Sequence, residues 1–273
     1  MPAINRRSLL GGLALLAASP ALAAPAETLS VEASEGRVAL NRFAAGRAGK
    51  RPAVLMLHGM RGFDLRPQAY QRYADALEHT LLPKLGLAGT YVRVPEARKG
   101  DYAQGYSSED QPVRVNPGVL ADEAYGVVSS AKDLLHYLHV QLGEAAVDPL
   151  TRRAIADTRI AYYQSGPMTQ DLAWEQYPWP VSRDDLLRGN ATAMVREDQP
   201  VTALKPPHAP SDGVLVNKTG ATGGFGAYIA FVPVKKLGLV ILTNRSHSTE
   251  ARVAFAYEVL KLLEPDALAA SSH

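Results

Sequence analysis

The most informative segment of the sequence is Val216-Asn217-Lys218-Thr219-Gly220-Ala221-Thr222-Gly223-Gly224-Phe225-Gly226. It begins as a short strand, predicted over residues 215–218. It then passes through glycines into a second strand over residues 225–232, which is rich in aromatic and β-branched residues. Residues 233–236 turn the chain, and residues 237–244 return as a third strand. The pattern predicts an antiparallel sheet built from segments that follow one another in the chain.

A helix is predicted immediately after the third strand. Ser248 or Thr249 can cap its first turn, residues 250–263 form its body, and Pro265 marks its end. Apolar residues recur at helical spacing along it, so we expect one face to pack on the sheet. The predicted inner face consists of Val253, Ala256, Tyr257, Leu260 and Leu263.

The tripeptide Lys218-Thr219-Gly220 on a strand edge resembles one of the three signatures of penicillin-recognising serine hydrolases. Other segments are similar, in order and spacing, to the C-terminal part of class C β-lactamases: residues 80–87, 101–106, 123–127, 168–170, 174–175, 217–233 and 237–252. The resemblance covers residues 79–265. It implies an α/β (α+β) fold in which an antiparallel sheet carries a packed C-terminal helix. The fold is expected to be incomplete, because the family's N-terminal strands and most of its helical middle are not matched.

The resemblance also assigns a site on the first strand. It implies that Lys218 stabilises negative charge near a nucleophile and helps proton movement. Thr219 would donate a hydrogen bond to a substrate carboxylate. Gly220 and Ala221 would belong to the same substrate-binding strand, with the Ala221 amide as one arm of an oxyanion hole. Arg252 matches a helix arginine near the carboxylate pocket. No metal or other cofactor is expected.

The other two signatures of the family, a Ser-x-x-Lys nucleophile helix and a Ser/Tyr-x-Asn element, are missing from their expected places. The chain contains one Ser-x-x-Lys, Ser129-Ser130-Ala131-Lys132, but this lies in a matched segment where the family has only a helix start. Ser130 together with Asp133 is predicted to cap that helix. The tripeptide Tyr102-Ala103-Gln104 resembles Tyr-x-Asn, but it ends in glutamine and also lies in a matched non-catalytic segment.

A few other features bear on the site. The chain departs from the family at Ser246 and Thr249, where relatives often carry asparagine. His136 and His139 are three residues apart on one predicted helix, and we expect them to be surface or packing residues rather than metal ligands. The proline-rich run at residues 199–210 is predicted to be an extended loop.

Composition limits the classes of function. The chain has 273 residues, of which 47% are hydrophobic and 21% charged, as in soluble globular proteins with a sizeable core. A net charge of +2 gives no reason to expect a nucleic-acid partner. The chain has no cysteine, which excludes a disulfide, a thiolate metal site and a cysteine nucleophile. The expected partner is a small molecule, a β-lactam or a peptidoglycan peptide, and the protein is expected to be a monomer.

The first 24 residues are predicted to be an export signal. Arg6-Arg7 precede an apolar stretch over residues 9–18, and residues 21–23 supply small side chains at a cleavage point. The apolar stretch is shorter than the ~20 residues that span a bilayer, so no membrane anchor is expected after cleavage. The paired arginines fit the twin-arginine route as well as ordinary signals. The mature protein is expected in a bacterial periplasm.

Residues 25–78 resemble the start of an α/β-hydrolase of the dienelactone hydrolase type. The predicted elements there are strands at residues 28–31, 37–43 and 52–57 and a helix at residues 67–77. His58-Gly59 follows the third of these strands, at a turn where that family forms part of its oxyanion hole. The family also needs a Gly-x-Ser-x-Gly or Gly-x-Cys-x-Gly elbow, and the sequence contains neither. The strands before residue 44 could pair onto the edge of the predicted sheet.

The predicted organisation is therefore an export signal (1–24), a hydrolase-like fragment (25–78), a class C β-lactamase-like region (79–265) and a tail (266–273). The sequence leaves three functions open. The first is a class C β-lactamase-like serine hydrolase that opens the β-lactam ring through an acyl-enzyme, impaired or inactive because two signatures are missing. The second is a dienelactone hydrolase-like esterase. The third is a non-catalytic chimeric remnant that binds β-lactam or peptidoglycan peptide weakly.

Overall fold

The computed structural model of the chain describes residues 73–116, 121–265 and 268. Of the N-terminal part it describes only the backbone of four strands: β1 (Ala14–Leu15), β2 (Glu27–Ala33), β3 (Gly36–Arg42) and β4 (Val54–Leu55). β2 and β3 form an antiparallel hairpin, and β1 pairs antiparallel with β4. Nearly all of the predicted export signal, His58-Gly59 and most of the predicted helix at residues 67–77 lie outside the described residues.

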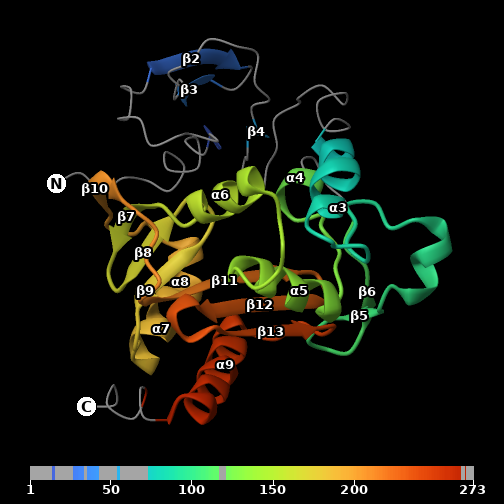
Figure 1. Cartoon of the computed structure of the whole chain (residues 1–273). Coiled ribbons are helices and arrows are strands. Elements are labelled where there is room, and N and C mark those ends of the chain that lie inside the picture. Colours follow the sequence, from blue (N-terminus) through green and yellow to red (C-terminus); the bar gives the residue numbers. More distant parts are fainter. Residues whose placement is uncertain are drawn as a thin grey trace.

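A seven-stranded antiparallel sheet forms the centre of the described region (Figure 1). Its strands follow the order β10-β7-β8-β9-β11-β12-β13. Their bounds are β7 (Ala161–Ser165), β8 (Met168–Asp171), β9 (Glu175–Pro178), β10 (Thr202–His208), β11 (Val214–Thr222), β12 (Phe225–Val232) and β13 (Leu237–Thr243). The three strands predicted from the opening stretch are thus neighbours at one side of this sheet.

The helices lie around this sheet, and several begin at a side-chain cap. The longer ones are α5 (Ala131–Gln141), α6 (Pro149–Asp157), α7 (Arg183–Gly189), α8 (Thr192–Arg196) and α9 (Thr249–Leu263). The short elements are η1 (Leu77–Leu81), α3 (Leu82–Lys84), η2 (Glu96–Asp101), β5 (Gly105–Tyr106), β6 (Pro112–Val113), α4 (Ala121–Ala124) and η3 (Pro233–Lys235). The Ser248 hydroxyl accepts a hydrogen bond from the Ala251 amide and so caps α9, as predicted. None of the described helices is both long and apolar enough to cross a membrane.

Different helices pack on the two faces of the sheet, because successive side chains along β12 point to opposite faces. Tyr228 and Val232 face α9 and belong to the same cluster as its Val253 and Leu260. Phe231 points to the opposite face, where it packs with residues such as Leu138 of α5. In Figure 1, α9 (red) crosses the sheet on one side while α5 lies on the other. The result is a helix–sheet–helix arrangement with an apolar layer on each side of the strands.

The first strand of this region is longer than predicted: β11 covers Val214–Thr222 instead of residues 215–218, because β12 pairs with it as far as Thr222. The other predictions for this region hold, with one error on the helix. β12 matches the predicted strand at residues 225–232, β13 ends one residue early, and α9 begins at Thr249. Leu260 is fully buried, but Leu263 is 54% exposed, so its predicted place on the inner face is wrong. The helix continues beyond the part that packs on the sheet, and periodicity carries no information on where that packing stops.

Two other expectations about strands are wrong. The proline-rich run is not a loop, because Thr202–His208 within it forms β10 and pairs with β7. Proline is tolerated there because β10 is the edge strand of the sheet and its pairing is irregular. The N-terminal strands β2 and β3 do not extend the main sheet: they pair with each other, and within the described residues β13 pairs only with β12.

Candidate active site

The strand β11 extends past its neighbour β9 and leaves an open edge. β9 pairs with β11 only up to Asn217, which lies opposite Glu175. β12 continues to pair with β11 as far as Thr222. Within the described part of the chain, residues 218–222 therefore have a strand on one side only, and Gly220 and Ala221 are exposed. A ligand could approach the backbone of this segment from the free side.

Lys218 is the first residue of this open segment, and its ammonium group is held in place. Its Nζ lies 2.9 Å from Oε1 of Glu175, the first residue of β9. The Glu175 side chain is 15% exposed and the Lys218 side chain 42% exposed. The Glu175 side chain is thus mostly buried, while the Lys218 side chain stays partly accessible to solvent and to a ligand. A pair of this kind keeps a positive charge fixed at the start of the open edge.

Asn217 locks the two strands together directly beneath this pair. Its side chain is fully buried, and its Nδ2 donates to the main-chain oxygen of Glu175 at 3.0 Å. The amide therefore fixes the end of β9 at the point where β11 becomes open. Thr219, the next residue after Lys218, pairs across the sheet with Tyr228, whose side chain is fully buried. The open segment of β11 is therefore supported by the packed core through β12.

Arg252 reaches the same strand from α9. Its Nη2 donates to the main-chain oxygen of Gly220 at 3.3 Å and to the Thr249 hydroxyl at 3.2 Å, and its Nη1 donates to the oxygen of His247 at 2.9 Å. The residue is 4% exposed, and burial lowers the pKa of its guanidinium although Glu250 raises it. The structure thus brings Arg252 to the predicted site as a buried support of the strand. Thr249 contributes by holding that guanidinium.

The hairpin that follows the open edge is braced by a distant segment. The rings of Tyr102 and Phe225 stack with centroids 5.9 Å apart. The Tyr106 main-chain oxygen accepts a hydrogen bond from the Ser246 amide at 2.9 Å. The Ser246 hydroxyl in turn accepts from the Gly224 amide at 3.2 Å, so the residue that departs from the family pattern holds the hairpin turn.

The one Ser-x-x-Lys of the chain has a structural role, as predicted. The Ser130 hydroxyl accepts from the Asp133 amide at 3.2 Å and caps α5. The Ser129 hydroxyl lies 2.7 Å from that of Thr90, whose hydroxyl donates to Asp133 at 2.7 Å. Lys132 is exposed. These serines belong to a network between α5 and the segment that contains Thr90.

The other candidates are also occupied by structural contacts. The Gln104 amide donates to the main-chain oxygens of Gly105 in β5 and Val113 in β6, so Gln104 supports this pair of strands. His139 lies 2.9 Å from Glu144, and His136 packs against Gly86. Over the residues that the structure describes, no three His, Asp or Glu side chains gather in a way that could hold a metal ion.

Two residues of the site were missed in the sequence. Glu175 and Asn217 position Lys218, yet neither was assigned a role. A signal for Glu175 existed: it is the one charged residue in the strand-like run Trp174-Glu175-Gln176-Tyr177, where a carboxylate needs a partner if it is to be buried. Asn217 precedes Lys218 directly, but nothing in the sequence indicates that its side chain turns toward β9.

Comparison with known proteins agrees with this geometry. The family model described as Beta-lactamase matches residues 66–263. A β-lactamase of Pseudomonas fluorescens is 46% identical over 194 residues, which are 71% of this chain and 54% of that protein. The crystal structure of a β-lactamase/D-alanine carboxypeptidase from Pseudomonas syringae has 50% identity and a TM-score of 0.67 over 69% of this chain and 52% of its own.

A class C β-lactamase from Rhodobacter sphaeroides has 44% identity and a TM-score of 0.67, over 70% of this chain and 54% of its own. The chain spans about half the length of the curated relatives it matches. The family match begins at residue 66, inside the predicted hydrolase-like fragment, whose resemblance stays a prediction. The family model, these relatives and the Lys218 strand together show that the chain belongs to the β-lactamase family and that its C-terminal part is of the class C type.

Proposed function

We propose that the open edge of β11 is the substrate-binding half of a class C β-lactamase-like serine hydrolase site. Its substrate would be a β-lactam or the D-alanyl end of a peptidoglycan peptide. The relative from Pseudomonas syringae, whose name joins β-lactamase and D-alanine carboxypeptidase, supports both classes. Lys218 and Thr219 would contact the substrate, Ala221 would offer its backbone amide from the segment that also contains Gly220, and Arg252 would hold the strand.

The observation that carries this proposal is the Lys218–Glu175 pair. The ammonium is fixed at 2.9 Å from a mostly buried carboxylate and remains accessible on its outer side. A cation held at a strand edge with unpaired amides can bind a carboxylate or an oxyanion without further rearrangement. An ordinary exposed lysine would lack this support, because a surface ion pair with two mobile partners holds neither in one place.

We propose further that this chain alone has little or no turnover. Acyl-enzyme chemistry needs a serine next to a base, and the one Ser-x-x-Lys of the chain is occupied in the cap of α5. The remaining function would be weak binding of the substrate classes named above. The first 24 residues support export to the periplasm, where the protein would act as a monomer.

Hydrolysis of a chromogenic cephalosporin by the purified mature chain tests this proposal. We expect no turnover above that of the Lys218→Ala variant. The matched control is Lys132→Ala, which removes the exposed lysine of the one Ser-x-x-Lys and should change nothing. Turnover that is lost in Lys218→Ala but kept in Lys132→Ala would contradict the expected inactivity and show a working site at β11.

Binding is measured separately from turnover. We expect a β-lactam to raise the melting temperature of the wild-type chain, because a ligand that binds only the folded state stabilises it. The rise should be smaller in Lys218→Ala and unchanged in Lys132→Ala. Equal shifts in wild type and Lys218→Ala would contradict the assignment of substrate binding to this strand.

A further inference from the structure

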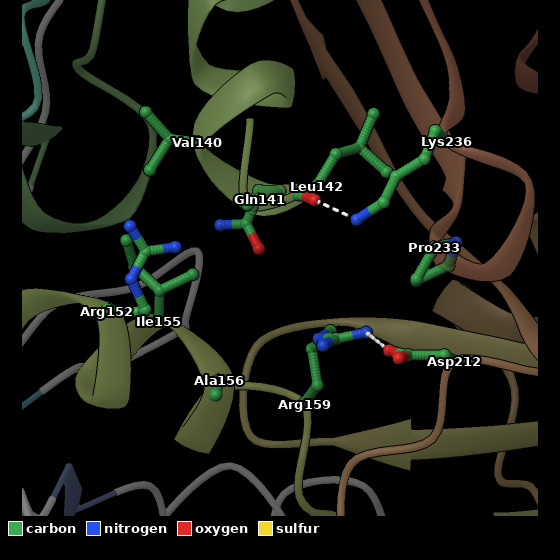
Figure 2. A pocket seen from close by; sticks show the side chains of 11 residues that line it. Val140, Gln141, Leu142, Arg152, Ile155, Ala156, Arg159, Asp212, Pro233 and Lys236 are labelled. Carbon is green, nitrogen blue, oxygen red and sulfur yellow. Dashed lines mark hydrogen bonds and ion pairs between the residues drawn. The ribbon is translucent and has the colours of Figure 1, made fainter. Parts of the chain in front are cut away.

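A pocket lies at the end of the sheet opposite to the Lys218 segment. β11 begins there and β12 ends there, whereas the turn after Thr222 lies at the other end. The pocket has a volume of about 200 Å³ and lies between the end of α5, α6, the loop before β11 and η3 (Figure 2). It shares no residue with the candidate active site.

Three cationic side chains line this pocket. Arg159 follows α6, Arg152 lies on α6, and Lys236 follows η3. A Cβ atom placed on Gly143 would lie 3.6 Å from Nη1 of Arg152, so this guanidinium lies over the end of α5. The ammonium of Lys236 donates to the main-chain oxygen of Leu142 at the same helix end. The cationic groups of Arg152, Arg159 and Lys236 thus surround the pocket.

The negative charge at this pocket is weak. Asp212 is the one carboxylate among its described lining residues, and its side chain is 72% exposed. It lies 3.5 Å from Nη1 of Arg159, which is long for a hydrogen-bonded ion pair. The buried carboxyl of Asp171 also acts on Arg159 electrostatically, but burial raises the pKa of Asp171 to about 8, so it is mostly neutral at neutral pH. The cationic groups outnumber the carboxylates.

Two buried polar side chains at the pocket have unused hydrogen-bonding groups. Arg159 is 9% exposed, and its Nε has no hydrogen-bonding partner among the described residues. Gln141 is 6% exposed, and neither atom of its amide meets strict hydrogen-bond geometry. Burial raises the pKa of the neighbouring Tyr137 hydroxyl and a side-chain contact with Gln141 lowers it, so Tyr137 engages at most part of this amide. In Figure 2 the Gln141 amide extends from the helix end into the space between Arg152 and Arg159.

Buried donors without partners carry a free-energy cost that a bound acceptor would remove. We propose that this pocket binds a small oxyanion of the phosphate or carboxylate class. The guanidinium forks of Arg159 and Arg152 suit the paired oxygens of such a group, and the Gln141 amide supplies a further donor. The volume is below the range that is usual for drug-sized ligands, which favours a small ion over a large ligand.

Isothermal titration of the full chain with inorganic phosphate, at constant ionic strength set with sodium chloride, tests the proposal. Arg152→Gln removes an exposed cation from the rim, and the matched control Arg153→Gln removes a neighbouring arginine that pairs with Asp157 and does not line the pocket. Gln141→Leu removes the buried amide and keeps the side-chain volume, so the variant should fold. A second titration, with butyrate in place of phosphate, shows whether the pocket binds a carboxylate or a phosphate more tightly.

We expect saturable binding of phosphate, of butyrate or of both to the wild type, against the chloride background. Arg152→Gln should weaken that binding about three- to fivefold, as for removal of one partly exposed charge. Gln141→Leu should weaken it about tenfold, because a buried donor is lost. Arg153→Gln should leave it unchanged. Absence of saturable binding of either anion, or equal weakening by Arg152→Gln and Arg153→Gln, would overturn the proposal.

Discussion

At the scale of single residues, Gly226 on β12 makes room for Arg252. A Cβ atom at this position would lie 2.4 Å from Nη1 and 2.7 Å from Cζ of Arg252. The guanidinium is 4% exposed and hydrogen-bonded to main-chain oxygens, so it cannot move aside. We therefore expect Gly226→Ala to lower the free energy of unfolding by about 2 kcal/mol.

The matched control for this change is Gly220→Ala on the neighbouring strand. Its added Cβ would meet nothing closer than the Cβ of Ala227 at 3.7 Å, which is ordinary contact. Its effect on the free energy of unfolding should stay within about 0.5 kcal/mol. Alanine restricts the backbone of the unfolded chain more than glycine does, and this gain offsets small costs in the folded state. Urea unfolding of the two variants measures both values. Similar stability of the two would contradict the packing of Arg252 against β12.

The candidate site could be predicted from the sequence only in part. Lys218 was singled out because a short motif carries it, and the role of Ser130 was predicted because capping depends on nearby residues. The open segment after Lys218 was not predicted, because the expected strand ended at Lys218. Glu175 was missed because it meets Lys218 only through the pairing of β9 with β11. The register of two strands more than 40 residues apart is set by the packed sheet, and single-sequence patterns do not contain it.

At the scale of elements, α9 shows where a periodic pattern stops being informative. Leu260 is fully buried under the sheet, whereas Leu263, one turn later, is 54% exposed. We expect Leu260→Ala to lower the free energy of unfolding by about 3 kcal/mol, since it creates a cavity in the core. Leu263→Ala should change it by less than about 0.5 kcal/mol. Thermal unfolding of both variants checks this, and equal losses would place Leu263 in the core.

Strands that pair with a neighbour in the sequence were predicted well, whereas a strand that pairs with a distant segment was not. The β12–β13 pair follows from alternation and a tight turn within twenty residues. β10 contains Pro206 and Pro207, which argue against a strand unless the strand lies at an edge. Its place at the edge of the sheet follows from the pairing with β7, and this was not visible in the proline-rich run itself.

At the scale of the whole molecule, one buried carboxyl should give the free energy of unfolding a distinct pH dependence. Asp171 at the end of β8 is 2% exposed, and neither of its carboxyl oxygens has a hydrogen-bonding partner among the described residues. Burial raises its pKa to about 8, Arg159 lowers it and Glu175 raises it. In the unfolded chain the same group has a pKa of about 3.9. The folded state therefore keeps a proton that the unfolded state releases between these two values.

The sign follows from this difference in bound protons. Below about pH 4 both states are protonated, and the contribution of Asp171 to stability is fully present. As pH rises toward about 8, the unfolded state ionises first, and the free energy of unfolding falls by roughly 1.4 kcal/mol per pH unit from this group. Asp171→Asn, which mimics the protonated form, should match the wild type at pH 4 and be more stable at pH 8. The control Asp212→Asn changes an exposed carboxylate and should leave the pH slope unchanged. Parallel pH profiles for wild type and Asp171→Asn, measured by urea unfolding, would show that Asp171 is ionised in the folded protein.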